Sequence, residues 1–150
     1  MHDPEPDLTV ARRLLGIDRG LCVVSLSRPD GSVSSSLVNA GPLPHPVDGT
    51  TVLGLVVRSS AYKHRRWRVA PRATLTVTRL WQWQAIEGPV ELFGPRDAVP
   101  GVGLPGLLRD VFAAAGGTHE DWDEFDRVMV EEQRVAVLLR PQRVYGQAER

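Results

Sequence analysis

"RSSAYKHRRWRVAPRATLTVT", residues 58–78, is the stretch that we expect to decide the fold. From Ala73 to Thr78 it alternates apolar residues with threonines, and this period of two predicts a half-buried β-strand. Before Pro71 it is short and basic, which predicts a brief helix that the proline brings to an end. An apolar run ends just before it, at Val57. The stretch therefore predicts a strand, a turn, a short helix and another strand, in that order.

The turn into this short helix carries residue types that bind an anion. We expect Ser60 to be the N-cap, because a serine hydroxyl accepts a hydrogen bond from the free amides of a first turn. Such a turn also favours negative charge. Arg58, Ser59 and Lys63 stand nearby, and Lys63 is the only lysine among the 18 Lys and Arg residues. A flexible ammonium reaches a phosphate from many directions. The hypothesis is a phosphate-bearing cofactor; a capped helix with a solvated basic face explains the same residue types equally well.

Outward from this stretch, the expected elements are short and mostly strands. Further helices are expected at residues 7–16, 104–117 and 119–133. Further strands are expected at residues 21–27, 32–40, 50–57, 81–94 and 134–146. Asp7 is the expected N-cap of the first helix and Gly16 its end, and the proline-rich residues 41–49 are expected to form a loop. Six strands with short helices between them predict a mainly β, antiparallel barrel or sandwich, as one domain over residues 1–150.

Composition argues against several classes of function. The chain has 18 acidic and 18 basic residues, so it lacks the overall positive field typical of nucleic-acid binding. Trp67 stands among basic residues, but so short a helix cannot present them all on one face to a nucleic acid. No apolar stretch approaches the roughly 18 residues that a membrane span needs, and the acidic, proline-rich start is unlike a signal peptide. We expect a soluble cytoplasmic protein, with Cys22 as a small core residue.

Motifs for catalysis by side chains alone are not recognisable. The four histidines, His2, His45, His64 and His119, lack metal-ligand spacing, and no Ser/His/Asp set stands out. The acidic residues between 120 and 126 alternate with aromatic ones, as on the wet face of an amphipathic helix. We therefore expect no metal site. An enzyme whose cofactor carries the chemistry is compatible with this pattern.

A family resemblance fits these observations. The order of "SSAYKHRRWRVAPRATLTVT", "WQAIEGPVELFG" and "RPQRVYG" resembles the split β-barrel flavoproteins of the pyridoxamine 5′-phosphate oxidase-like superfamily. More narrowly, it is similar to the actinobacterial branch that uses the deazaflavin coenzyme F-420, over about Leu15 to Gly146. The resemblance implies a six-stranded antiparallel split β-barrel of the FMN-binding type and a homodimer with the cofactor at the subunit interface. It also implies an oxidoreductase that passes hydride from reduced F-420 to a small unsaturated or conjugated substrate.

The resemblance also implies roles for particular residues. The contacts to the phosphate-bearing side chain of the cofactor would be Arg58, Ser59, Ser60 and Lys63. The segment along the ring would be Ser36, Leu37, Val38 and Asn39, whose small serines allow a close approach of the backbone. The aromatic residues that border the partner subunit's pocket would be Trp81 and Trp83. Arg66 replaces an asparagine of this branch, and is either a contact for a second anionic group, such as the polyglutamate tail of F-420, or a surface residue.

A second departure from the family pattern leaves alternatives open. The segment "NAGPLP", residues 39–44, stands where many relatives have an aromatic residue, so the choice between F-420 and FMN is not decided. The first alternative is an FMN-dependent oxidoreductase on the same barrel. The second is a non-catalytic protein that binds a flavin, a deazaflavin or another molecule such as haem.

Overall fold

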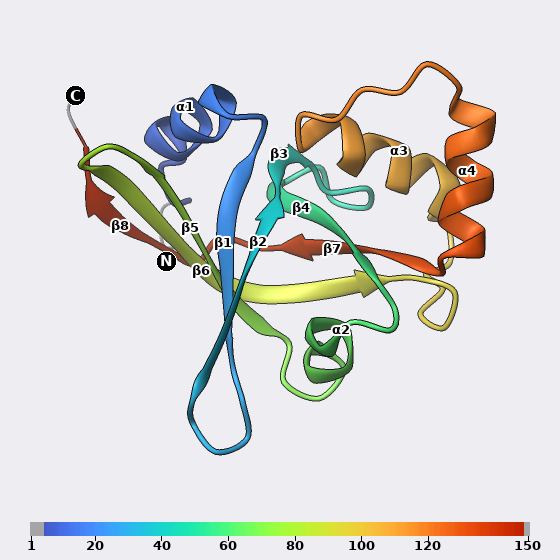
Figure 1. Ribbon diagram of the computed structural model, residues 1–150, viewed down its shortest axis with the longest axis horizontal. Helices are drawn as coiled ribbons and strands as arrows, with labels where there is room; N and C mark the ends of the chain where they lie inside the picture. Colours follow the sequence, from blue (N-terminus) through green and yellow to red (C-terminus); the bar gives the residue numbers. More distant parts are fainter. Residues whose placement is uncertain (1–4, 149–150) are drawn as a thin grey trace.

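The computed structural model describes residues 5–148, which form one antiparallel sheet with helices packed around it (Figure 1). The helices are α1 (Thr9–Ile17), α2 (Tyr62–Trp67), α3 (Leu104–Ala114) and α4 (Trp122–Glu131). The strands are β1 (Leu21–Ser27), β2 (Val33–Asn39), β3 (Gly41–Pro44), β4 (Thr51–Arg58), β5 (Arg72–Arg79), β6 (Gln82–Phe93), β7 (Arg134–Leu139) and β8 (Arg143–Gln147). The predicted order of strand, turn, short helix and strand over residues 58–78 is confirmed as β4, α2 and β5.

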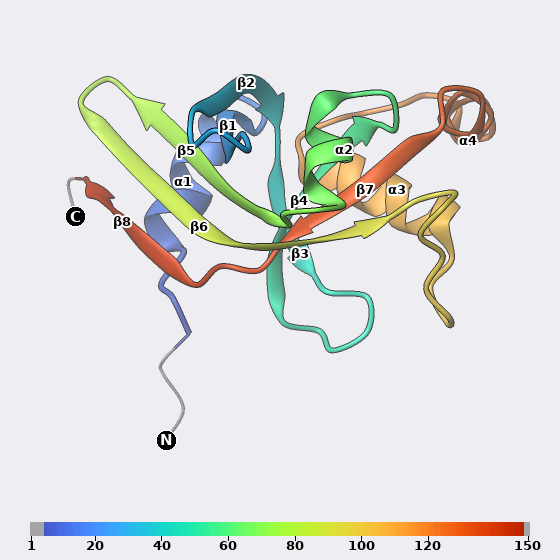
Figure 2. The ribbon, with the colours of Figure 1, turned by 90° about the horizontal axis from the view of Figure 1, so that it is seen from below.

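The sheet is built around the long strand β6. The strand order is β2-β1-β5-β6-β7-β4-β3, and β8 pairs with β6 outside this path. The first part of β6 pairs with β5 and β8, whereas its last residues pair with β7. At the change of partner a Cβ atom on Gly88 would lie 1.8 Å from the Arg140 carbonyl oxygen, so only glycine fits there. Residues 87–89 are thus the point where the sheet divides into two strongly curved halves (Figure 2).

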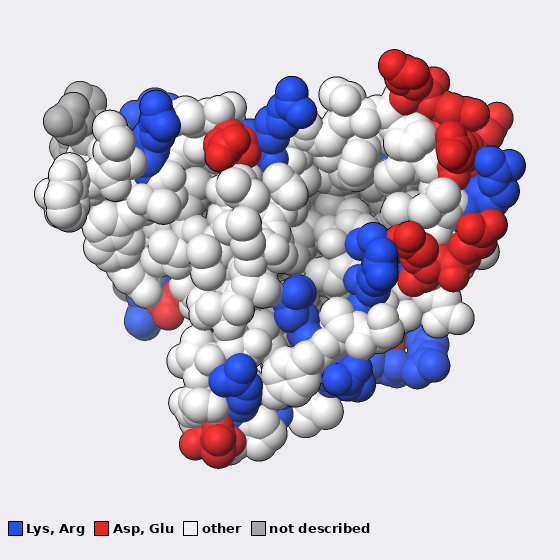
Figure 3. Space-filling view, in the orientation of Figure 1, with Lys and Arg blue, Asp and Glu red and all other residues white. Residues whose placement is uncertain are grey.

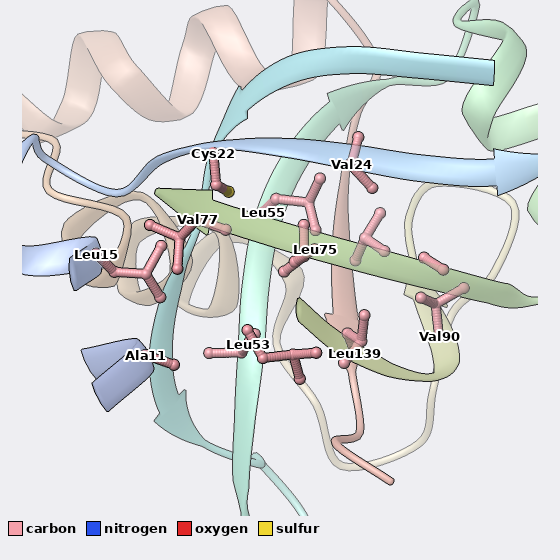
Figure 4. Close-up of a cluster of buried hydrophobic side chains, with 14 of the residues drawn as sticks. Ala11, Leu15, Cys22, Val24, Leu53, Leu55, Leu75, Val77, Val90 and Leu139 are labelled. Carbon is pink, nitrogen blue, oxygen red and sulfur yellow. The ribbon is translucent and has the colours of Figure 1, made fainter. Parts of the chain in front are cut away.

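Two apolar clusters fill the two halves. The larger cluster lies inside the curved sheet and includes Leu15, Val24, Leu55, Leu75 and the other side chains of Figure 4. The smaller one lies between the sheet and the pair α3–α4, where the buried strands β4 and β7 face the helices. Strands β4 and β7 therefore read as continuous apolar runs, because both of their faces are covered. Cys22 is a buried core residue as predicted, and burial raises the pKa of its thiol to about 12.

The mainly β, antiparallel architecture is confirmed, but the sheet is not closed and has eight described strands instead of six. The expected loop at residues 41–49 begins with the strand β3, in which Pro42 pairs with Leu53. Proline is tolerated there because β3 is an edge strand, where one side needs no N–H donor. The expected last strand is two strands, β7 and β8, separated at residues 140–142.

The predicted ends of α1 are wrong by one residue at each end. Asp7 accepts hydrogen bonds from the backbone and hydroxyl of Thr9, at 2.9 and 2.7 Å, but the N-cap position is Leu8. The helix continues through Gly16 to Ile17, since the left-handed residues that end it are Arg19 and Gly20. Within residues 5–148, no helix has the length and apolar character needed to cross a membrane.

Candidate functional site

A cavity of about 760 Å³ opens between β2, the turn from β4 into α2, and the linker that joins α3 to α4. Figure 3 shows the hollow beside β2, with Lys and Arg side chains along its edge and acidic side chains gathered over α4. The volume lies within the range of about 300–1,000 Å³ that is usual for sites of small molecules. It is therefore large enough for a cofactor or substrate.

Most of the predicted site residues come together at this cavity. Six of them line it: Leu37, Val38, Asn39, Arg58, Ser60 and Lys63. Ser36 lies beside it, because its Oγ atom accepts a hydrogen bond of 3.0 Å from the Lys63 Nζ atom. The two predicted segments, on β2 and at the start of α2, therefore meet at the Lys63–Ser36 hydrogen bond.

The other predicted residues lie elsewhere in the single chain. Ser59 turns toward the start of β7, where its Oγ atom donates to the Gln133 side chain at 3.2 Å. The Arg66 Nε atom donates to the Ser27 carbonyl oxygen at 2.8 Å. Trp83 packs edge-to-face against Tyr145, with 6.0 Å between the ring centroids. None of the three lines the cavity, and their part in binding stays a prediction.

The helix α2 differs from its expected form. Its N-cap is Ala61 instead of Ser60, and no side chain caps it. Ala61 takes the extended conformation that an N-cap needs, and its preceding turn is closed by a bond from its own amide to the Arg58 carbonyl. With six residues, α2 has little more than one turn, so its dipole is small and any attraction for an anion must come from side chains.

Apart from Lys63, the basic residues of this region are held by local partners. His64 donates from Nδ1 to the Ser59 carbonyl oxygen at 3.0 Å, and Arg65 donates to the Ser60 carbonyl oxygen at 2.6 Å. Arg68 lies 3.5 Å from the Asp97 carboxylate. Lys63 is thus the basic residue of α2 that lines the cavity.

Trp67 is not available to a nucleic acid. Its side chain is among the largest that are fully buried, and its Nε1 atom donates to the Arg72 carbonyl oxygen at 3.1 Å. An aromatic ring in this position packs the base of α2 onto the core and cannot stack on a nucleotide base.

The lining of the cavity is positively charged. It contains Arg19, Arg58, Lys63 and Arg134, and none of the described residues that line it is acidic. Arg58 and Arg134 share the nearby Glu132 carboxylate, at 3.6 and 2.7 Å. The hydrogen bond from Arg134 lowers the pKa of Glu132. By contrast, Lys63 and Arg19 form no ion pair with a carboxylate of residues 5–148. The cavity therefore favours an anionic ligand.

Several lining residues were missed by the sequence analysis. The apolar residues among them are Val56, Val57, Phe112 and Met129. The linker residues 115–118, Ala61, Arg19 and Arg134 also belong to the lining. The pair Gly116–Gly117 was visible as a helix end, but nothing in its spacing shows that Gly116 packs on the turn at Arg19, far away in the chain.

Metal-binding clusters are absent from the described part of the chain, where no three His, Cys, Asp or Glu side chains gather. His45 and His64 are both buried and hydrogen-bonded within the protein. His119 packs among Phe112, Trp122 and Phe125. His2 lies outside the described residues.

Comparison with known proteins supports the fold. No protein-family model matches the chain. A conserved hypothetical protein from Mycobacterium tuberculosis is 16% identical, covers 97% of this chain and 88% of its own, and has a TM-score of 0.65. A pyridoxamine 5′-phosphate oxidase-related, FMN-binding protein from Nostoc punctiforme is 11% identical; the match covers 95% of this chain and 84% of that protein, with a TM-score of 0.61. A protein described as an F420 reductase is 20% identical; the match covers 97% of this chain and 100% of that protein, with a TM-score of 0.59.

Haem-binding proteins also match this fold. At such low identities these likenesses show the fold alone, which is the split β-barrel of FMN-binding proteins. The predicted fold class is confirmed. The fold is compatible with oxidoreductases and with proteins that only bind a flavin or haem.

Proposed function

We propose that this chain is an oxidoreductase that binds the deazaflavin coenzyme F-420 in the cavity beside β2 and reduces a small unsaturated or conjugated substrate. The observation that carries the proposal is Lys63. Its ammonium group lines a cavity with apolar walls, is oriented by Ser36 and forms no ion pair with a carboxylate of the described residues. An unpaired cation at such a place is best explained by an anionic ligand.

The residues present fit a phosphate-bearing flavin or deazaflavin. An ammonium has three donors, and Ser36 takes one of them, so two remain for phosphate oxygens. Ser60, which has a hydroxyl, and Arg58, which has a guanidinium, are also among the residues that line the cavity. The apolar side chains of Leu37, Val56 and Phe112 give the ring a surface to pack against.

When bound, the reduced cofactor supplies a hydride to an electron-poor double bond. The protein holds the anionic side chain at Lys63, aligns the ring along β2 and excludes water with its apolar walls. None of the described lining residues is a His, Cys, Asp, Glu or Tyr, and the proposal gives the ammonium of Lys63 to the anionic cofactor. We propose that the proton that follows the hydride comes from solvent.

The first alternative is that FMN binds in the same cavity, and this alternative is supported by the FMN-binding protein of the same fold. FMN has a phosphate and a flat ring, so Lys63 and the apolar wall serve it equally well. A flavin absorbance band in the protein as purified favours FMN. A colourless protein that quenches the fluorescence of added F-420 favours the deazaflavin. Binding of either one, or of haem, without turnover of quinones and enones would favour a non-catalytic binding protein.

The central experiment is titration of F-420 and of FMN into the wild type, Lys63→Ala and Lys63→Arg. We expect Lys63→Ala to weaken binding of the preferred cofactor about 10- to 100-fold, because it removes charge-assisted hydrogen bonds of about 1.5–3 kcal/mol. Lys63→Arg retains the charge but not the compact ammonium, and the expected loss is below tenfold.

Arg127→Gln is the matched control for these titrations. Arg127 is an exposed residue of α4, does not line the cavity, and its substitution makes the same change in net charge. Equal affinities of the wild type and Lys63→Ala for both cofactors would remove the proposed seat.

A homodimer with the cofactor at the subunit interface is part of the proposal. It is supported by the hairpin between β5 and β6, whose tip residues Leu80 and Trp81 are 83% and 89% exposed. Apolar side chains so displayed are typical of contacts with another chain. Sedimentation of the wild type and of Trp81→Ser tests this, and a monomeric wild type would contradict it.

A further inference from the structure

Arg19 is presented to the cavity by an unusual backbone. It lies in the turn between α1 and β1 with a φ of 50°, in the left-handed region that side chains other than glycine rarely adopt. Its carbonyl oxygen accepts a hydrogen bond of 3.0 Å from the Asn39 side chain, at the end of β2. The turn is therefore tied to the strand that forms one wall of the cavity.

The linker between α3 and α4 packs on the same turn. Gly116 has a φ of 87°, and a Cβ atom there would lie 2.8 Å from both the Cα atom and the carbonyl carbon of Arg19. Only glycine allows this approach. A non-glycine residue in the left-handed region is strained and persists only where its surroundings hold it. Here Asn39 on one side and Gly116 on the other supply that support.

Arg19 is among the residues that line the cavity and, among the described residues, has no carboxylate within ion-pair distance. It thus resembles Lys63 and differs from Arg58 and Arg134, which share Glu132. Lys63 contacts β2 through its ammonium at Ser36, whereas Arg19 contacts β2 through its backbone carbonyl at Asn39. Three residues of a strand span about 10 Å. The two uncompensated cationic residues of the cavity are thus joined to one strand at separate places.

We propose that Arg19 is a specificity-determining residue, which binds the carboxylate of the molecule that is reduced. The assignment of that molecule as a hydride acceptor rests on the proposed function. Lys63 then serves the phosphate of the cofactor, and Arg19 serves a flat, conjugated carboxylic acid beside it. A guanidinium suits a carboxylate, because its planar fork donates two parallel hydrogen bonds.

The reaction balances without another reagent. A bound reduced cofactor would supply the hydride, and with it both electrons, to one carbon of the acceptor's double bond. The π electrons move to the neighbouring carbon, which takes a proton from solvent. The carboxylate at Arg19 is not consumed, so the role of Arg19 is to hold the acceptor.

The test uses two probes of equal shape, 2-naphthoate and 2-naphthamide, titrated by calorimetry. Both probes are titrated into Lys63→Met and into the double variant Lys63→Met/Arg19→Gln. In these variants Lys63 cannot bind the naphthoate, and the titration needs no cofactor. We expect Lys63→Met to bind naphthoate about tenfold more tightly than naphthamide. The double variant should bind the two probes equally, with its naphthamide affinity unchanged. Lys63→Met/Arg127→Gln should keep the tenfold preference.

Three outcomes would overturn the inference. The first is a preference for naphthoate that survives Arg19→Gln, and the second is no detectable naphthoate binding at millimolar concentration. The third concerns the carboxylates of the F-420 tail, which have the same chemistry. If Arg19→Gln weakens F-420 but leaves naphthoate bound as in its parent, then Arg19 serves the cofactor. Failure of the proposed function would show instead as unchanged cofactor affinity in Lys63→Ala, a measurement that does not involve Arg19.

Discussion

Two polar regions of this molecule contain the same kinds of side chain but differ in whether their charges are paired. The cavity holds Lys63 and Arg19, which form no ion pairs with carboxylates of the described chain. The turn between β3 and β4 holds a second cluster, which we call the turn cluster and which consists of His45, Asp48, Thr50, Glu91 and Arg140. In Figure 2 this turn lies at the bottom, whereas α2 lies on the opposite side of the sheet.

In the turn cluster every charge is paired. Arg140 donates to the carboxylates of Glu91 and, at 2.8 Å, of Asp48, and to the hydroxyl of Thr50 at 3.0 Å. His45 is buried, donates to Glu91 at 3.1 Å and accepts from the amide of Val47. These bonds close the turn onto β6 and the end of β7. The turn cluster is thus built for stability.

The difference shows which polar groups indicate binding. Paired charges stabilise the fold that contains them, whereas unpaired cations repel one another and contribute to folding little or nothing. Cations kept unpaired beside an apolar wall are therefore expected to gain their partners from a ligand. The predictions below test this distinction.

Reversing the charge at the cavity should have the largest effect. Lys63→Glu places a carboxylate where an anion is expected, and we expect cofactor binding to weaken more than about 100-fold. The urea midpoint should stay the same or rise, because repulsion among the cavity cations is relieved. A large loss of stability in this variant would show that Lys63 has a structural role.

Breaking the turn cluster should lower the stability of the protein and leave cofactor binding almost unchanged. Arg140→Gln leaves Glu91 and Asp48 without their cation, and we expect a loss of about 1–2 kcal/mol in the free energy of unfolding, after allowing for solvent screening of these partly exposed groups. Cofactor affinity, measured by titration, should change less than twofold. A comparable loss of affinity would mean that the two regions are coupled.

Acid should weaken the turn cluster selectively. Hydrogen bonds from Thr50 and then Arg140 hold the pKa of Asp48 below its usual value. Burial alone would raise the pKa of Glu91, but hydrogen bonds from Arg140 and His45 lower it overall. Groups with lowered pKa values stabilise the protein above their unfolded pKa, and this stability is lost as the pH falls through the folded pKa.

The measurement for this prediction is urea unfolding at a series of pH values. We expect the midpoint to fall between about pH 5 and pH 3, by less than the effect of Arg140→Gln at neutral pH. The fall should be smaller in Arg140→Gln, since that variant has already lost the bonds from Arg140 to Glu91 and Asp48. An equal slope in both proteins would contradict the assignment.

Removing the acid that Arg58 and Arg134 share should give the smallest effect. Glu132→Gln leaves both guanidinium groups unpaired at the cavity, and we expect the anionic cofactor to bind about threefold more tightly. The gain should disappear in high salt, because these charges are near the surface. Weaker binding in Glu132→Gln would indicate that the carboxylate positions the two arginines and does not merely compensate them.

The local sequence predicted the strands correctly where the periodicity of apolar residues and the order of elements along the chain determine which strands pair. The alternation in residues 73–78 and the apolar runs of β4 and β7 gave strands at their observed places. Residues 41–44 were misjudged because proline argues against a strand, unless the strand lies at an edge. Whether a strand is an edge is settled by tertiary pairing, which the local sequence does not contain.

The candidate site was predictable only in part for a similar reason. Lys63 was recognisable as the only lysine of the chain, and the serines of β2 as a segment that a ring can approach closely. Arg19 and the wall formed by α3 and its linker gave no signal, because they reach the cavity through contacts with residues far away in the chain. The N-cap was misplaced by one residue because Ser60 and Ala61 both stand in the turn, and only the backbone angles distinguish them.

The helices α3 and α4 form an excursion between β6 and β7, which are neighbours in the sheet. This excursion supplies Phe112, Met129 and the glycine linker to the cavity, whereas Lys63 comes from α2 and Ser36 from β2. Loops and insertions change in length and sequence far more readily than the paired strands that carry them. During evolution, descendants of this scaffold can therefore acquire new ligands by remodelling residues 94–133 while they inherit an unchanged pair of Lys63 and Ser36.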